Sequence, residues 1–361
     1  MTKRTRMSRR EFIRLLTACG FSATAAGALF SLTGCDAEQS SELVVQPTAT
    51  AESATATPQP SAEPLPTGET VDPAAVPTDE PATETPTEGP IATGTDLAIA
   101  RGSSPTALVQ AAVAALGGIE AFVKPGDDVI IKPNIVAADY SYEYAAYTNP
   151  EVVAAITALC VGAGAGRVRT MDRPSSSTCE QVYARSGIGD AVRAAGGEME
   201  VMSDVKYREV AIPEGRDITS WSVYGDVLDA DVFINVPIAK HHRLSKLTLS
   251  MKNLMGVIQN RNQFHPNLGQ RIADLNSLVR PTLTILDAVN ILMANGPRGG
   301  NLSDVKQMNT VIASWDFVAA GSYAATFFDQ TGADIDALRC AAEMGLGTLD
   351  YGSLRIEEIA V

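Results

Sequence analysis

From Leu97 onward, short apolar runs alternate with amphipathic segments of helical length, and this alternation constrains the fold more than any other feature. Such alternation is typical of α/β proteins with a mainly parallel sheet. We expect strands at 97–101, 128–134, 167–172, 198–203, 208–212, 231–237, 282–287, 309–316 and 354–361. We expect helices at 105–116, from 150 to about 160, from about 179, before 196–197, and at 248–258, 268–279, 317–330 and 335–344. The sequence therefore predicts an α/β fold in which helices flank a mainly parallel sheet.

The alternation begins where the composition changes sharply. Residues 36–95 carry eleven acidic side chains, no Lys or Arg, no aromatic residue and ten of the twenty prolines. This segment has too little apolar surface to bury, and proline and like charges extend it, so we predict a disordered linker. Much of the formal charge of −14 belongs to the linker, because residues 96–361 carry 22 basic and 30 acidic side chains. The α/β domain is therefore expected at 96–361.

Residues 1–34 have the form of an export signal, with an Arg-rich start and then a moderately apolar stretch. Residues 8–13 (SRREFI) resemble the twin-arginine consensus, and residues 32–35 (LTGC) resemble a bacterial lipobox. These resemblances imply passage through the twin-arginine translocase, then lipidation of Cys35 by lipoprotein-processing enzymes. An ordinary N-terminal membrane helix is the alternative. The expected location is the outer face of the cytoplasmic membrane or the cell surface, held there by lipid on Cys35 at the start of the linker (35–95).

The stretch 232–273 differs from the rest of this acidic chain. It contains no Asp or Glu, six Lys or Arg, and all three histidines. A local run of cationic and titratable side chains is how a site for an anionic ligand or cofactor looks in sequence. The alternative is a solvated basic face, to which we assign Arg243, Lys246, Arg261 and Arg271.

Polar side chains gather at the predicted strand ends, where ligands bind in open α/β sheets. They are Lys132, Asn134, Asp172, Arg173, Lys240, His242, Asp287, Asn295 and Asp316. Helix capping alone is an alternative explanation for Asp172 and Asp316. Because the cations of the basic stretch begin shortly after the predicted strand 231–237, we expect these side chains to line one crevice.

Individual roles follow from the chemistry of these side chains. We expect Lys240 and Lys252 to hold an anion, and His242 to act as general base or metal ligand because nearby cations keep it neutral. The predicted ligand-binding residues are Lys132, Asn134, Asn253, Asp287 and Asn295, with Asp287 as partner to a cation or to His242. Lys252, on the predicted helix 248–258, faces inward or snorkels outward.

The other two histidines and a metal site are left more open. For His241 we expect a histidine bound to backbone, and His265 stays undecided. A three-ligand metal site would need Asp172 or Asp287 in addition to histidine.

Several site classes are disfavoured by the sequence. Cys160, Cys179 and Cys340 form no CxxC, so neither an iron-sulfur cluster nor a thiolate zinc site is expected, and Cys160 is expected in the core. The glycine-rich segments 162–166 and 296–300 do not match phosphate-binding loops. Nucleic acid is disfavoured as a partner because, after the predicted strand 231–237, the basic stretch holds one aromatic residue, Phe264.

One series of residues carries a family resemblance: Pro237, Lys240, His242, Thr248, Lys252, Asn253 and Gly256. It is similar, at the same spacing, to the P-K-x-K-T-H, T and K-N-x-x-G pattern of the domain of unknown function 362 family, and ordered motifs extend the resemblance over 97–361. Ile238, His241 and Gly321 depart from the pattern, and Gly321 puts an acid or metal role near Asp316 in doubt. The resemblance implies no settled activity. Some relatives add ferredoxin-like cysteines, which this chain lacks, and the same region has a distant likeness to nickel-pincer lactate racemases.

These observations predict a lipid-anchored extracytoplasmic α/β protein that binds a small anionic ligand or cofactor in a strand-end crevice. If it is an enzyme, oxidoreductase and isomerase are the classes considered, with no cofactor identified. The alternative is a non-catalytic solute-binding or cell-envelope lipoprotein.

Overall fold

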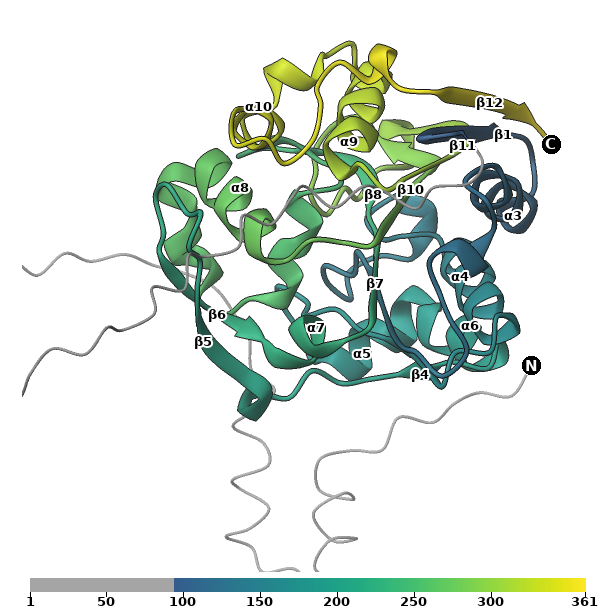
Figure 1. The fold of residues 1–361 in the computed structure, drawn as a ribbon, viewed down its shortest axis with the longest axis horizontal. Helices are drawn as coiled ribbons and strands as arrows, with labels where there is room; N and C mark the ends of the chain where they lie inside the picture. Colours follow the sequence, from purple (N-terminus) through teal and green to yellow (C-terminus); the bar gives the residue numbers. More distant parts are fainter. Residues whose placement is uncertain (1–93) are drawn as a thin grey trace, which may run out of the picture. The chain divides into compact units, whose positions relative to one another are not determined.

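A mixed sheet of ten strands runs through residues 94–361, which this computed structural model describes (Figure 1). The strand order is β12-β1-β11-β10-β7-β2-β3-β4, with β8 paired to β10 and β9 to β8. The strands are β1 (Leu97–Arg101), β2 (Asp128–Pro133), β3 (Arg167–Thr170), β4 (Glu198–Met199), β7 (Val232–Val236), β8 (Ile238–His242), β9 (Lys246–Thr248), β10 (Leu283–Leu292), β11 (Val305–Ser314) and β12 (Ile356–Ala360). The predicted signal peptide, Cys35 and the linker up to residue 93 lie outside the described residues.

The predicted α/β fold with a mainly parallel sheet is confirmed. Strands β4, β3, β2, β7 and β10 pair in parallel, whereas β11 runs antiparallel to both β10 and β1. The antiparallel part exists because β11 follows β10 without an intervening α-helix, and strands joined in this way pair in opposite directions. The strand predicted at 354–361 is β12, which pairs in parallel with β1 at the sheet edge.

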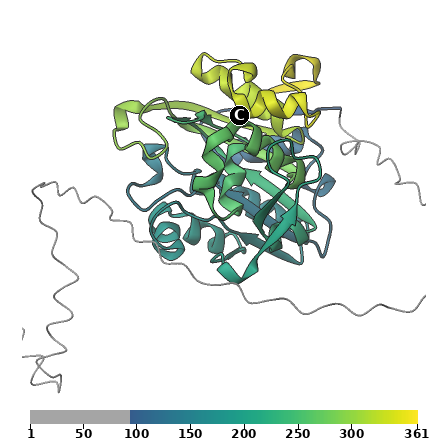
Figure 2. The same cartoon turned by 90° about the vertical axis from the view of Figure 1, so that its left-hand side faces the viewer.

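Helices cover both faces of the sheet (Figures 1 and 2). Successive strand side chains point to opposite faces, so Ile130 belongs to one hydrophobic core and Ile131 to the other. The core with Ile130 is closed by α8 (Leu268–Leu278), α9 (Phe317–Ala325) and α10 (Asp336–Glu343). The core with Ile131 is closed by α3 (Pro105–Ala115), α4 (Pro150–Gly162), α5 (Cys179–Ser186) and α6 (Ile188–Ala194). Within 94–361, no helix is both long and apolar enough to cross a membrane.

Helix starts agree with the capping residues in the sequence. The Asn149 side chain accepts from the backbone N–H of Glu151, and Pro150 is the first residue of α4. Thr178 caps α5. Asp316 caps α9 by accepting from the backbone N–H groups of Val318 and Ala319 at 2.9 and 2.8 Å. The capping alternative for Asp316 is therefore the one that the structure shows.

The predicted helix over 248–258 is wrong. The segment starts at the end of β9, turns, and continues as a 3-10 helix, η4 (Lys252–Val257). Leu247 and Leu249 are buried as in a strand, and Leu254, Met255, Val257 and Ile258 are all buried. Burial on every side gives apolar residues at many spacings, so periodicity could not separate a helix from this irregular path. Residues 238–242, which follow the predicted strand 231–237, form strand β8, paired antiparallel with β9.

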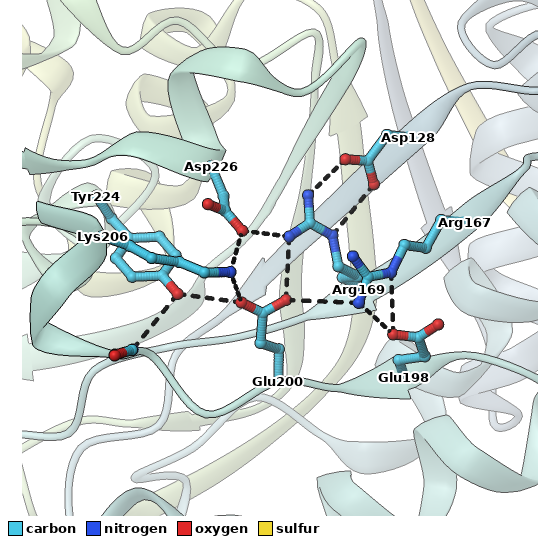
Figure 3. Close-up of polar contacts among 9 residues, drawn as sticks. Asp128, Arg167, Arg169, Glu198, Glu200, Lys206, Tyr224 and Asp226 are labelled. Carbon is cyan, nitrogen blue, oxygen red and sulfur yellow. Dashed lines mark hydrogen bonds and ion pairs between the residues drawn. The ribbon is translucent and has the colours of Figure 1, made fainter.

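Strands β5 (Tyr207–Ala211) and β6 (Ser220–Tyr224) form a separate antiparallel pair, followed by α7 (Gly225–Asp229). An ion network joins this hairpin to the main sheet (Figure 3). Its centre is Arg169 on β3, which is 4% exposed and contacts Asp128, Glu200 and Asp226. Burial alone would lower the pKa of Arg169, but the hydrogen bonds that its guanidinium donates to the three carboxylates raise it. Four of the five N–H groups of Arg169 thus donate to carboxylates, and we assign the network a structural role.

Candidate functional site

A cavity of about 560 Å³ lies at the carboxyl ends of β2 and β3. Asn134 follows β2, Asp172 follows β3, and Lys240 and His242 enter from β8. The rest of the wall comes largely from η4 and from η5 (Arg261–Asn267). This position matches the general rule that open α/β sheets bind ligands beyond the carboxyl ends of their strands. The cavity is therefore the candidate functional site.

Basic side chains outnumber acidic ones in the cavity wall. The cationic or titratable lining residues are Arg173, Lys240, His242, Lys252, Arg261 and His265. Asp172 is the one carboxylate among the described lining residues, and its Oδ1 lies 2.8 Å from Nζ of the fully buried Lys132. Because Lys132 balances the charge of Asp172, the remaining wall is cationic and suits an anion.

Asn253 holds η4 against the sheet. Its Oδ1 accepts from Nδ2 of Asn134 at 2.9 Å and from Nζ of Lys132 at 3.3 Å. Its Nδ2 donates to Oδ1 of Asn235 at 2.8 Å and to the backbone oxygen of Lys132 at 3.2 Å. An amide has two donors and one oxygen with two acceptor sites, so the hydrogen-bonding capacity of Asn253 is used. Asn253 is thus a positioning residue.

Lys240 supports the same network from β8. Its Nζ donates to Oδ1 of Asn134 at 2.8 Å and to the backbone oxygen of Ala146 at 2.7 Å. Burial, together with the nearby charge of Lys252, lowers the pKa of Lys240 well below its ordinary value. Two of the three N–H groups of the Lys240 ammonium therefore donate to protein oxygens, which leaves one N–H group for a ligand.

His242 is a neutral ring with an assigned tautomer. Burial first, then the charges of Lys252 and Lys240, lowers the pKa of His242 to about 3. Its Nδ1 accepts from the backbone N–H groups of Leu244 and Ser245 at 3.2 and 3.4 Å. A neutral imidazole carries one proton, so this proton lies on Nε2. His242 is neutral as predicted, but burial rather than like charge is the main cause, and the ring offers a donor to the cavity rather than a base.

Lys252 is the partly buried cation of the wall with the fewest partners. Burial and the charges of Arg261 and Lys132 lower the pKa of Lys252 to about 8. Within the described residues its Nζ has one polar contact, the thioether sulfur of Met255 at 3.8 Å. The ammonium group is therefore available to a ligand.

Three of the predicted ligand-binding residues, Lys132, Asp287 and Asn295, do not line the cavity, and the last two lie elsewhere. Asp287, fully buried on β10, accepts from the backbone N–H groups of Asn149 and Val289 at 2.7 and 2.9 Å, and burial raises its pKa to about 6. Asn295 donates to Asp304 at 2.7 Å. Neither lines the cavity, and Asp287 does not partner His242. These side chains bind neighbouring backbone and loop groups instead.

Arg261, which the sequence placed on a solvated face, and His265, whose role it left undecided, both line the cavity. The guanidinium of Arg261 donates to the backbone oxygens of Arg173 and Pro174 at 3.0 and 2.7 Å, so it is not solvated as expected. This contact folds η5 over the end of β3. Arg271, by contrast, is paired with Asp217 away from the cavity. The sequence feature that could have indicated Arg261 as a cavity residue is its place within 232–273, a stretch without Asp or Glu.

His241 and the cysteines take structural positions. His241 accepts from the backbone N–H of Gly296 at 3.0 Å, as expected for a histidine bound to backbone. Cys160 is buried in the core as predicted, and Cys340 is also buried. Across 94–361, no group of three or more His, Cys, Asp or Glu side chains is arranged to hold a metal ion.

Comparisons with known proteins give one family match. The family model described as Domain of unknown function (DUF362) matches residues 129–326. A thylakoid-associated protein of Synechocystis sp. is 28% identical over 213 residues, which are 56% of this chain and 64% of that protein.

Two solved structures resemble the chain at low sequence identity. The lactate racemase apoprotein from Thermoanaerobacterium thermosaccharolyticum has a TM-score of 0.40 and 10% identity, over 63% of this chain and 56% of that one. A protein from Thermotoga maritima has a TM-score of 0.42 and 11% identity, over 63% of this chain and 60% of that one. The chain spans less than two thirds of the length of each of these three proteins.

Proposed function

This chain belongs to the family described as Domain of unknown function (DUF362), and from that premise we propose that it binds a small anionic ligand in the strand-end cavity. The observation that carries the proposal is the cavity wall, in which two lysines and two arginines face one carboxylate that Lys132 already neutralises. The volume of about 560 Å³ falls within the range of roughly 300–1,000 Å³ that is typical of small-molecule sites. A carboxylate or phosphate on a small molecule is the expected ligand group.

The proposed contacts divide between charge and hydrogen bonding. Lys252 and Arg261 supply positive charge, and Nε2–H of His242 supplies a donor. Asn253 and Lys240 hold this arrangement through the network beneath η4. A partly desolvated cation attracts an anion more strongly than an exposed one, because the local dielectric is lower.

We extend the proposal to turnover of the ligand, by an oxidoreductase or an isomerase. Lys252 and His242 have shifted pKa values in a cavity, which is common at catalytic sites. The second candidate is a non-catalytic binding protein. It is favoured by the occupied Nδ1 of His242, which leaves the ring as a donor rather than a base.

The affinity for anions is expected to fall as pH rises through about 8. Below that pH Lys252 is a cation and attracts the anion, and above it the amine is neutral. Oxalate, phosphate and sulfate are the probes, with affinities measured by calorimetric titration. Lys252→Arg keeps its charge at higher pH and should remove this fall.

Arg261→Gln should weaken the same binding by about tenfold or more, since a charged hydrogen bond contributes about 1.5–3 kcal/mol. Arg271→Gln is the matched control, because Arg271 lies in the same basic stretch but pairs with Asp217. Equal losses in the two variants, or no binding of any probe, would contradict the proposed function.

We also propose that the protein is exported and anchored to the membrane by lipid on Cys35, on the basis of the sequence motifs at 8–13 and 32–35. Cells that express the full chain should incorporate labelled palmitate into it, and Cys35→Ser should lose the label. Globomycin should cause the unprocessed precursor to accumulate. A Cys35→Ser protein that keeps the label would contradict the anchor.

A further inference from the structure

The three lysines at the cavity differ in how their amines are engaged. Nζ of Lys132 contacts Asp172, the oxygen of Pro133 and Oδ1 of Asn253. Nζ of Lys240 donates to two oxygens. Nζ of Lys252 contacts only the sulfur of Met255 among the described residues. Lys252 therefore has the amine whose lone pair is least obstructed once it loses its proton.

The surroundings of Lys252 favour loss of that proton. The side chain also lines a second, smaller hollow of about 100 Å³, whose wall includes the apolar side chains of Leu247, Leu268 and Ile272. The charged and titratable groups around Lys252 are Lys132, Asp172, Arg173, Lys240, His242, Lys246, Arg261, His265 and Asp336. Asp172 is paired with Lys132, and Asp336 with Arg339. Cations thus predominate around an amine that has no carboxylate partner of its own in the described structure.

We propose that Lys252 is a nucleophile that forms an imine with the carbonyl group of an anionic ligand, of which a 2-oxo acid is the simplest class. This inference rests on the proposed function, because the cationic wall must first hold the carboxylate of the ligand. Arg261 and the remaining donor of Lys240 are placed to hold it. The carbonyl carbon then lies within the same cavity as the free amine.

The step balances without an external oxidant or reductant. The neutral amine of Lys252 attacks the carbonyl carbon and forms a carbon–nitrogen bond. The carbonyl oxygen leaves as water with the two hydrogens of the amine, and the carbon–nitrogen double bond remains. The Nε2–H of His242 is available in the cavity to donate to the departing oxygen. Imine formation makes the neighbouring carbon more acidic, which is the general use of lysine imines in catalysis.

Reductive trapping on the full-length protein tests the inference. The protein is incubated with pyruvate and sodium cyanoborohydride, and adducts are located by peptide mass mapping. We expect one dominant adduct on Lys252, formed faster as pH rises through about 8. Lys252→Arg should abolish it while retaining the far-ultraviolet circular dichroism spectrum of the parent protein. Lys306→Arg, at an exposed lysine on β11, should leave it unchanged.

The outcomes separate this inference from the proposed function. Adducts spread over surface lysines, equal in the parent protein and Lys252→Arg, would overturn the inference. Oxalate binding with no pyruvate adduct on Lys252 would also overturn it, and would support the non-catalytic binding protein. The absence of oxalate, phosphate and sulfate binding would contradict the proposed function itself.

Discussion

Replacement of Asp172 by asparagine is expected to lower the free energy of unfolding by about 3–5 kcal/mol, because it breaks a buried ion pair from one side. Asp172 is 3% exposed, and its Oδ1 lies 2.8 Å from Nζ of the fully buried Lys132. Without this carboxylate, Lys132 either keeps an unbalanced charge in the core or gives up its proton. Urea unfolding monitored by circular dichroism measures the loss.

Two controls identify the cause of this loss. Asp190→Asn removes an exposed carboxylate that pairs with Arg193, and it should change the stability by less than about 1 kcal/mol. Lys132→Met combined with Asp172→Asn should recover part of the stability, because no buried charge is left without a partner. If Asp172→Asn cost as little as Asp190→Asn, the ion pair would not be a major stabilising contact.

Gly256→Ala should lower the free energy of unfolding about as much as Asp172→Asn, although it adds only a methyl group. A Cβ at this position would lie 1.9 Å from Oδ1 of Asp172 and 2.6 Å from Nζ of Lys132. Overpacking typically costs about 1–3 kcal/mol and sometimes more. Here the neighbours are a buried ion pair with little room to move, so we expect at least the upper value. Gly256 also lines the cavity, so oxalate binding should be lost with it.

Gly162→Ala is the matched control for this steric effect. Gly162 ends α4, and a Cβ there would meet no atom within 4 Å. Alanine has the higher helix propensity, so the variant should be as stable as the parent protein or slightly more stable. Thermal unfolding compares the two variants, and a similar melting temperature for both would show that the contact with the ion pair does not limit residue 256.

The sheet could be predicted because its strands are strongly apolar and its helices are capped. Segments such as 128–133 and 232–236 are buried on both faces, and Asn149 and Thr178 mark helix starts. Strand β6 could not be predicted in the same way. Its residues Ser220 and Ser222 are polar and less buried, because the β5–β6 hairpin packs outside the main sheet.

The candidate site could be predicted in part. The strand-end rule and the family pattern selected Asn134, Lys240, His242, Lys252 and Asn253, and the structure brings all five to one cavity. They could not reveal which atoms are already engaged. The committed amide of Asn253 and the occupied Nδ1 of His242 depend on contacts between segments far apart in the chain.

Asp287 was selected by the same strand-end rule but does not line the cavity. It lies at the end of a predicted strand, but its carboxylate accepts from backbone N–H groups of Asn149 and Val289. Position along a strand therefore predicts which edge of the sheet a side chain is near, and not what it contacts.

Strand β1 has a consequence for how the protein is made. It lies between β11 and β12, so the first strand of the described domain pairs only with strands from the C-terminal part of that domain. The contact from Ser314 to the oxygen of Asp96 closes a separation of 218 residues. Such distant pairing is entropically costly and slows folding. During synthesis both edges of β1 therefore stay unpaired until β11 and β12 have been made, and an unpaired edge can pair with another chain. A chain truncated before β11 should therefore be prone to aggregate, whereas in the full chain β11 and β12 pair with both edges of β1.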